Sequence, residues 1–279
     1  MEYSQQKVNY LEAMAKKLRL NVILSVGVDY AGHIGGSLSS ADIVSALYFY
    51  KMRYDPSNPS LPERDRFLLS KGHVAILQYA ALVEAGFFPR SELKTTKQLG
   101  SMLQGHPDVL KTPGVEAGTG SLGQGLSIGL GMALGLRDSY QDSHVYVLCG
   151  DGEMAEGQIW EAAMAAGAYH TSNLVAIVDQ NGLQANGRVE DRLNTNPLSD
   201  KWRACGWNVL TIDGHDMRQI MSALDTAAAE RTKPTVIIAK TVKGKGLSFA
   251  ENVVSFHNGK LTQEQFEQAL KELEGDEIL

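Results

Sequence analysis

Hydrophobic residues along the chain alternate between two spacings. Short apolar runs are too brief for helices, and they predict strands at residues 66–70, 145–148, 174–178, 208–212 and 235–239. Segments of helical spacing lie between and around them, at 72–85, 122–137, 156–168, 197–204 and 217–230. This alternation predicts an α/β fold in which a parallel sheet carries helices on both faces. The ligand of such a sheet is expected beyond the carboxyl ends of its strands.

The flanking segments extend this fold. Helical spacing from Ser4 to about Asp29 predicts an N-terminal helical extension, and Ser39 or Ser40 is expected to cap a second helix. Residues 100–120 form a long irregular stretch of the kind that is usually functional, and the chain closes with an acidic helical tail. We expect residues 1–279 to form a single domain.

Composition narrows the function. The chain has 279 residues and a net charge of -6, with no basic stretch, which argues against nucleic-acid binding. Its densest basic cluster, Lys240, Lys243 and Lys245, is sufficient for a phosphorylated small molecule. Cys149 and Cys205 are expected to be free thiols, which favours a reducing compartment. The first turns lack the pattern of a signal peptide and no apolar run is long enough to span a bilayer, so we expect a cytoplasmic protein.

Oxygen-bearing side chains follow two of the predicted strands. The strand 145–148 leads into Gly150-Asp151-Gly152, and the strand 174–178 leads into Asp179-Gln180-Asn181-Gly182. A hard divalent cation takes oxygen ligands, and Asp151 can supply a carboxylate, Asn181 an amide and Leu183 a backbone carbonyl. The flanking glycines allow a diphosphate to approach the backbone. A single Asp-Gly pair usually only caps a turn, but the paired pattern favours a metal-diphosphate site.

The glycine-rich segment Gly118–Gly123 has the Gly-x-Gly-x-x-Gly spacing of the dinucleotide-binding fingerprint. That fingerprint requires a preceding strand, and Pro113 and Gly114 rule a central strand out, so a nicotinamide or flavin site is not expected. The phosphate-binding loop of ATPases is absent from the sequence. The segment remains a turn that opens a helix, where free backbone N–H groups suit an anion.

These motifs together resemble the transketolases, a family of thiamine diphosphate enzymes. Gly150-Asp151-Gly152 followed thirty residues later by Asn181 is similar to the thiamine diphosphate signature. "AGHIGGSLSSADIVSALY", "LSKGHVAILQYAAL", "LQGHPD", "PGVEAGTGSLGQGLSIGLGMALG" and "KTVKGKGLSFAENVVSFHNGKL" resemble further segments of that family, in order, over nearly the whole chain.

The resemblance implies a role for each matching residue. Magnesium, or calcium in its place, would be held by Asp151, Asn181 and the Leu183 carbonyl. Thiamine diphosphate would be bound by His73, Gly120, Ser121, Leu122, Gly152, Asn181 and His257. His33, His106 and His257 would act on the substrate, and Glu156 would connect paired active sites across a dimer. Ser121 departs from the family, which commonly has proline there, but the expected contact uses the main chain.

Four histidines lie in matching motifs, namely His33, His73, His106 and His257. A lone histidine is more often structural, and we give that interpretation to His144, His170 and His215. The four motif histidines lie among glycines in loops or at helix starts, which favours function. An imidazole that titrates near neutrality suits proton relay to sugar hydroxyls.

The resemblance implies transfer of a two-carbon ketol unit from a ketose phosphate to an aldose phosphate. A complete transketolase is more than twice as long, and its cofactor-activating glutamate lies in a part that this sequence lacks. We therefore expect a partner polypeptide that carries the pyrimidine-binding and C-terminal domains, in an α2β2 heterotetramer. Three alternatives remain: a deoxyxylulose-phosphate synthase, the α subunit of a 2-ketoacid dehydrogenase, or a non-catalytic regulatory subunit. The histidine set argues against a decarboxylating relative, and the retained metal ligands argue against an inactive one.

Overall fold

The computed structural model describes residues 3–28, 30–140 and 142–274. Its α-helices are α1 (Gln5–Val26), α2 (Ile34–Ser39), α3 (Ala41–Ala46), α4 (Ala75–Glu84), α5 (Gln124–Arg137), α6 (Gly157–Ala168), α7 (Val189–Arg192), α8 (Leu198–Ala204), α9 (Met217–Ala229) and α10 (Gln263–Glu274). A π-helical turn, η1 (Leu47–Lys51), continues α3, and short 3-10 turns are η2 (Gly72–Val74), η3 (Arg90–Thr95), η4 (Gly152–Ala155) and η5 (Val254–His257).

Five parallel strands form the central sheet, in the order β1-β2-β3-β7-β6. They are β1 (Arg66–Leu69), β2 (Val145–Gly150), β3 (Leu174–Gln180), β6 (Asn208–Asp213) and β7 (Thr235–Lys240). Each strand run predicted from the apolar pattern is present, and the parallel arrangement is confirmed. A small antiparallel hairpin of β4 (Leu183–Gln184) and β5 (Gly187–Arg188) follows β3.

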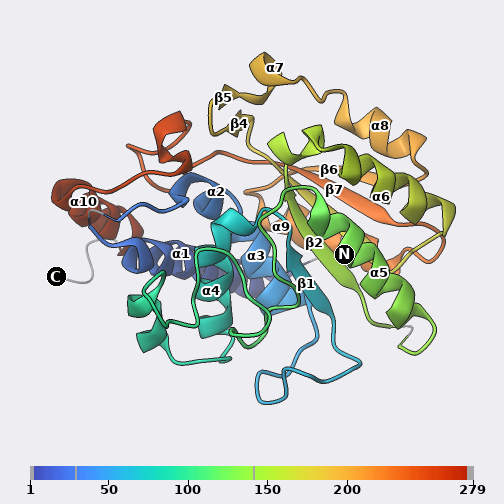
Figure 1. The fold of residues 1–279 in the computed structure, drawn as a ribbon, viewed down its shortest axis with the longest axis horizontal. Helices are drawn as coiled ribbons and strands as arrows, with labels where there is room; N and C mark the ends of the chain where they lie inside the picture. The colour runs from blue at the N-terminus through green and yellow to red at the C-terminus, as the bar shows by residue number, and fades with distance from the viewer. Residues whose placement is uncertain (1–2, 29, 141, 275–279) are drawn as a thin grey trace.

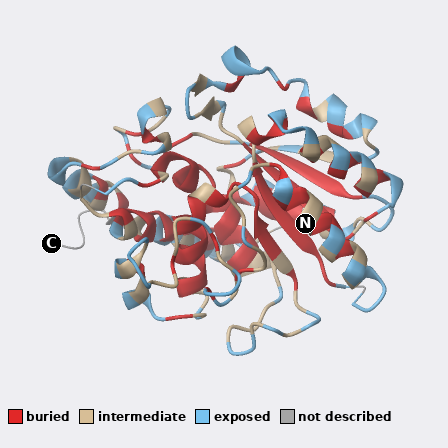
Figure 2. Cartoon of the chain, in the orientation of Figure 1, coloured by how far each residue is buried: buried red, intermediate tan, exposed pale blue. Residues whose placement is uncertain are grey.

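Helices cover both faces of the sheet, as predicted (Figure 1). One face packs on α1, α3, α4 and α9 through inward residues such as Tyr146, Ile177 and Ile237. The opposite face packs on α5, α6 and α8 through the alternate residues Val147, Ala176 and Ile238. The strands β1, β2, β3 and β7 are therefore buried on both faces, which explains why they read as continuous apolar runs, whereas the edge strand β6 is only partly buried (Figure 2).

The N-terminal helical region differs in detail from the prediction. Helix α1 begins after Ser4, whose hydroxyl accepts a hydrogen bond from Lys7 N, and it ends at Val26; the predicted end at Asp29 lies outside the described residues. An additional helix, α2, precedes the predicted one. Ser40 is the N-cap residue of α3, as predicted, but its hydroxyl donates to Gly36 O and makes no capping hydrogen bond to α3.

The long loop, the C-terminal helix and the two cysteines agree with the sequence-based expectations. Residues 96–123 contain neither helix nor strand, and α10 forms the predicted helical tail and packs on α1, while residues 275–279 lie outside the described part. Cys149 and Cys205 are free; Cys149 is buried and Cys205 is half-buried. No helix among the described residues is long and apolar enough to cross a membrane.

Candidate cofactor and substrate site

Asp151 and Asn181 lie together at the carboxyl edge of the sheet because β2 and β3 are neighbours in register. Gly150 stands opposite Asp179, so both strands leave the sheet at the same level. The Asp151 carboxylate accepts hydrogen bonds from Gly152 N at 2.8 Å and from Gly182 N at 2.6 Å. The two strand-end motifs therefore form one structural unit.

Three oxygen donors of this unit suit a hard cation. Beside the Asp151 carboxylate, Asn181 Oδ1 accepts from Leu183 N at 3.1 Å, and the Leu183 carbonyl accepts from Lys243 Nζ at 2.8 Å. Lys243 is 2% exposed, so a buried ammonium group already contacts the Leu183 carbonyl oxygen. No group of three or more His, Cys, Asp or Glu side chains among the described residues could hold a metal, so a cation here would depend on the amide and carbonyl oxygens.

Buried charges surround Asp151. Burial, and next the nearby carboxylate of Asp179, raise the pKa of Asp151 to about 6. Burial and the charge of Lys71 lower the pKa of Lys243 to about 8. A bound dication would favour the ionised form of Asp151. The donor set and its charges therefore fit a divalent metal with a diphosphate.

A cavity of about 470 Å³ opens above these oxygens. Its size is in the range of small-molecule sites. Its lining includes most of the residues that the sequence selected, namely His33, His73, His106, Gly120, Leu122, Asp151, Gly152, Glu156, Asn181, Leu183 and His257. Ser121 is exposed between Gly120 and Leu122 and does not line it. Of the basic cluster, Lys243 lines the cavity, whereas Lys240 and Lys245 line a separate hollow.

Three of the four motif histidines form a cluster in the cavity. The ring centroids lie 4.8 Å apart for His33 and His73, 5.5 Å for His33 and His257, and 5.3 Å for His73 and His257. His33 immediately precedes α2, His73 lies in η2 and His257 closes η5, so three separate chain segments supply them. Nδ1 of His33 is buried and has no hydrogen-bond partner among the described residues.

The site keeps these imidazoles neutral. Burial and nearby lysines, including Lys97 at His33 and Lys243 at His257, lower the pKa of His33 and His257 to about 4. Burial and Lys71 lower the pKa of His73 to about 2. The sequence suggested titration near neutrality, but desolvation and the surrounding cations oppose the imidazolium form.

The neutral histidines are poised to donate or accept hydrogen bonds. His257 Nδ1 lies 3.0 Å from Lys243 Nζ. An ammonium can only donate, so His257 carries its proton on Nε2. In this tautomer, His257 can donate a hydrogen bond from Nε2.

The glycine-rich loop packs closely against the histidine segments. A Cβ at Gly120, where φ is 153°, would lie 2.8 Å from the His106 ring, and a Cβ at Gly72 would lie 2.6 Å from Thr119. The hydroxyl of Thr119 is buried without a partner among the described residues, and Thr119 does not line the cavity. The glycines therefore allow this loop to lie against the histidine segments, where a larger residue would not fit.

Sequence reasoning missed Glu153, which joins the two halves of this cradle. Its carboxylate accepts from Gly123 N at 2.8 Å, from Gly150 N at 3.0 Å and from Ser70 Oγ at 2.5 Å. Glu153 is 2% exposed, and burial raises its pKa. Its position two residues after Asp151 could have identified it from the sequence as part of the same site. Glu156, by contrast, is exposed at the start of α6 on the cavity rim.

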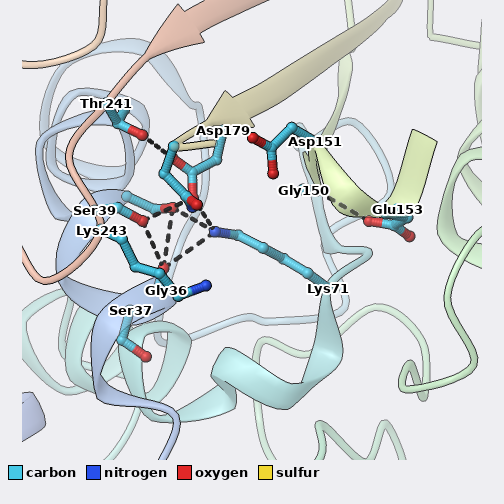
Figure 3. A network of polar contacts seen from close by, with 12 residues as sticks. Gly36, Ser37, Ser39, Lys71, Gly150, Asp151, Glu153, Asp179, Thr241 and Lys243 are labelled. Carbon is cyan, nitrogen blue, oxygen red and sulfur yellow. Dashed lines mark hydrogen bonds and ion pairs between the residues drawn. The ribbon is translucent and has the colours of Figure 1, made fainter. Parts of the chain in front are cut away.

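The sequence also gave little indication of a buried ion pair between Lys71 and Asp179 (Figure 3). Lys71 Nζ lies 2.6 Å from Asp179 Oδ2, and both side chains are almost completely buried. The partners lie 108 residues apart in the chain. Only the pairing of β1, β2 and β3 brings them together.

Comparison with known proteins identifies the family of this chain. Residues 11–277 match the family model "Transketolase, thiamine diphosphate binding domain". The chain is 45% identical over 274 residues to the 6-deoxy-6-sulfo-D-fructose transketolase subunit SqwG of Clostridium sp., and the match covers 98% of both proteins. It is 42% identical to one subunit of the apulose-4-phosphate transketolase of Phocaeicola vulgatus, covering 96% of this chain and 95% of that one.

Solved structures agree with the fold. The transketolase of Campylobacter jejuni aligns with a TM-score of 0.89 at 33% identity, over 98% of this chain and 43% of that chain. A transketolase of Pichia stipitis in complex with sedoheptulose 7-phosphate gives a TM-score of 0.89 at 31% identity, over 95% and 41% of the two chains. The chain thus spans less than half the length of these transketolases and nearly all of the separate subunits. It belongs to the transketolase family, as the thiamine diphosphate-binding part.

Proposed function

We propose that this chain is the diphosphate-binding subunit of a transketolase, which transfers a two-carbon ketol unit from a ketose to an aldose. The observation that carries the proposal is the joining of Asp151, Asn181 and Leu183 at the base of the cavity that holds the histidine cluster. Thiamine diphosphate, when bound, supplies the chemistry that breaks and forms the carbon–carbon bond. The chain supplies position, charge and proton transfer.

The residues that follow strands β2 and β3 would bind the metal. Asp151, Asn181 and the Leu183 carbonyl would hold magnesium, or calcium in its place, and the metal would neutralise the diphosphate. The diphosphate and thiazolium would lie among His73, Gly120, Ser121, Leu122, Gly152, Asn181 and His257. Lys243, already close to the Leu183 oxygen, adds a positive charge on the same side.

The histidines would form hydrogen bonds with the sugar substrate and exchange protons with it. His33 and His257 both line the cavity, and a neutral imidazole can accept a hydrogen bond at one ring nitrogen and donate one from the other, as His257 can from Nε2. His106, whose ring packs against Gly120, lines the same cavity and would help to bind the substrate. Glu156 would act between paired sites.

A partner chain completes the proposed enzyme. The chain matches relatives named as subunits over nearly their whole length, but spans only about 40% of single-chain transketolases. Leu99 and Leu110, in the loop 96–123, are 106% and 92% exposed, as expected for a surface that another polypeptide covers. We propose one cofactor-binding domain over residues 1–279, assembled as two copies with two partner subunits in the cytoplasm.

The donor sugar can be identified by a direct assay. The relatives are named for 6-deoxy-6-sulfo-D-fructose and for apulose 4-phosphate, so the donor is expected to be a ketose with an anionic group. The assay mixes the chain with its partner, magnesium and thiamine diphosphate, and offers these two ketoses and xylulose 5-phosphate, with ribose 5-phosphate as acceptor. Ketol transfer from at least one donor supports the proposal. Cofactor binding without transfer from a broad ketose panel would contradict it.

A further inference from the structure

The carboxylate of Asp179 forms a hydrogen bond with the side-chain amide of Asn181. Asn181 Nδ2 donates to Asp179 Oδ2 at 2.9 Å, while Asn181 Oδ1 accepts from Leu183 N at 3.1 Å. An ionised carboxylate has no proton to donate, so it can bind the NH2 group of the amide but not its oxygen. A flip of the amide would set two oxygens against each other. Asp179 therefore selects one orientation of the Asn181 side chain.

The charge of Asp179 is balanced within the protein. Its carboxylate is fully buried and accepts from Lys71 Nζ at 2.6 Å, from Ser39 Oγ at 2.7 Å and from the Thr241 hydroxyl (Figure 3). These donors come from the loop after β1, from α2 and from the loop after β7. They stabilise the ionised form, in which the carboxylate remains an acceptor only.

Lys71 has further partners of its own. Its ammonium also donates to Ser40 Oγ at 2.7 Å and to Gly36 O at 3.1 Å, and the side chain is buried. All three of its protons are thus used inside the protein. Lys71 neutralises Asp179, which stands two residues from the Asn181 ligand.

We propose that Asp179 is a positioning residue for the metal site: its carboxylate, which pairs with Lys71, fixes the Asn181 amide with the oxygen available to the metal. This inference rests on the proposed function, because it assumes that Asn181 binds the cation. It assigns to Asp179 a role beyond stability, since orientation of a ligand changes metal affinity. Loss of such a supporting hydrogen bond typically costs 10- to 100-fold in metal affinity.

The test measures binding and stability separately. The full chain is titrated with Mn²⁺ at saturating thiamine diphosphate, free Mn²⁺ is followed by electron paramagnetic resonance, and thermal unfolding is recorded in parallel. Asp179→Asn should weaken Mn²⁺ binding about tenfold or more. That single change leaves Lys71 unpaired, so it cannot by itself separate orientation from charge and stability.

A charge-balanced double variant makes that separation. Lys71→Met with Asp179→Leu removes both charges and the acceptor, and apolar replacement of a buried ion pair is often neutral for stability. However, Ser39 and Thr241 also lose an acceptor, so we expect a lowered melting temperature. Below that temperature, we expect Mn²⁺ binding still weaker by about tenfold. Wild-type Mn²⁺ affinity in this variant would overturn the proposal.

An exchange of the two side chains supplies a rescue. In Asp179→Asn with Asn181→Asp, a carboxylate becomes the ligand, and its two equivalent oxygens need no selection. We expect Mn²⁺ affinity to return to within about threefold of wild type, although Lys71 remains without its ion pair. A purely structural role predicts no recovery, and that result would also reject the inference.

Asn181→Ala distinguishes the inference from its premise. If this variant binds Mn²⁺ like the wild type, or if the wild type does not bind, the proposed metal site itself is wrong. Asn181→Ala can lose Mn²⁺ binding while Asp179→Asn and the Lys71→Met, Asp179→Leu variant retain it. In that case the metal site stands and only the positioning role of Asp179 is rejected.

Discussion

The carboxylate of Asp151 and the backbone N–H of Gly182 form a 2.6 Å hydrogen bond that ties the end of β2 to the end of β3. This contact closes the gap between the two motifs that the sequence places thirty residues apart. It also means that Asp151 has both a structural and a proposed metal-binding role, and the two can be tested together.

Asp151→Ala should abolish magnesium-dependent binding of thiamine diphosphate, with affinity reduced by about 100-fold or more, because a direct ligand is lost. Calorimetry of the assembled enzyme measures this. Asp213→Ala is the matched control, since Asp213 is the exposed carboxylate at the end of β6 and does not line the cavity. Unchanged cofactor affinity in Asp151→Ala would refute the metal assignment.

His33→Ala and His257→Ala should each lower turnover by about 10²-fold or more, the scale of a lost proton-transfer group, while cofactor affinity changes less. Steady-state kinetics of the assembled enzyme check this. His170→Asn is a suitable control because His170 is exposed, and its positive φ of 50° is tolerated by asparagine. Wild-type turnover in both alanine variants would return these histidines to a structural role.

Acid should destabilise the chain through its buried histidines. The pKa of His33 and His257 is lowered to about 4 in the fold, so the unfolded chain binds more protons between about pH 6.5 and 4. Stability is then present above pH 6.5 and lost as the pH falls toward 4. Since both rings are partly exposed, we expect roughly 1 kcal/mol per histidine at pH 5.5.

Thermal unfolding at pH 7.5, 6.5 and 5.5 tests this coupling. A His33→Gln, His257→Gln double variant should lose less stability over this interval than the wild type. Parallel curves for the two proteins would show that these histidines titrate alike in the folded and unfolded chain.

Glu153→Ala should destabilise the fold by about 2–4 kcal/mol, because it leaves the buried donors of Ser70, Gly123 and Gly150 without an acceptor. Urea unfolding provides the measurement. Glu161→Ala, at an exposed position of α6, should change stability by less than about 0.5 kcal/mol. Equal effects of the two substitutions would mean that Glu153 does not hold the two loops together.

The isolated chain should show no ketol transfer from xylulose 5-phosphate to ribose 5-phosphate, even with excess magnesium and cofactor. The carboxyl group that activates the cofactor is expected on the partner, as the family resemblance implies. Activity that arises only after the second polypeptide is added would support this. Robust turnover by the pure chain would sink the prediction.

The strands and the strand-end residues could be predicted because their signals are local. Apolar runs mark β2, β3 and β7, and a parallel sheet then brings Asp151 and Asn181 to one edge. Helix α2 was missed because its sequence, Ile34–Ser39, is rich in glycine and serine and has poor helix propensity. Hairpin β4–β5 was also missed, although Asn186-Gly187 is a turn signal.

Contacts between distant segments could not be predicted. Lys71 and Asp179 carry no local mark of burial, and their pairing depends on which strands become neighbours. The lowered pKa of the histidines has the same origin, since it follows from desolvation and from Lys97, Lys71 and Lys243, which approach only in the folded chain. His215, interpreted as structural, lies against Asp42 and accepts from Val242 N, outside the histidine cluster.

The Lys71–Asp179 pair also restricts how this sequence can change. Replacing either residue alone leaves a buried charge without its counterpart, which typically costs 3–5 kcal/mol, a large part of the stability of a domain. A gradual exchange of the pair would therefore pass through a less stable chain. Laboratory evolution that varies one position at a time should retain both residues, and only libraries that vary the two codons jointly should recover functional alternatives.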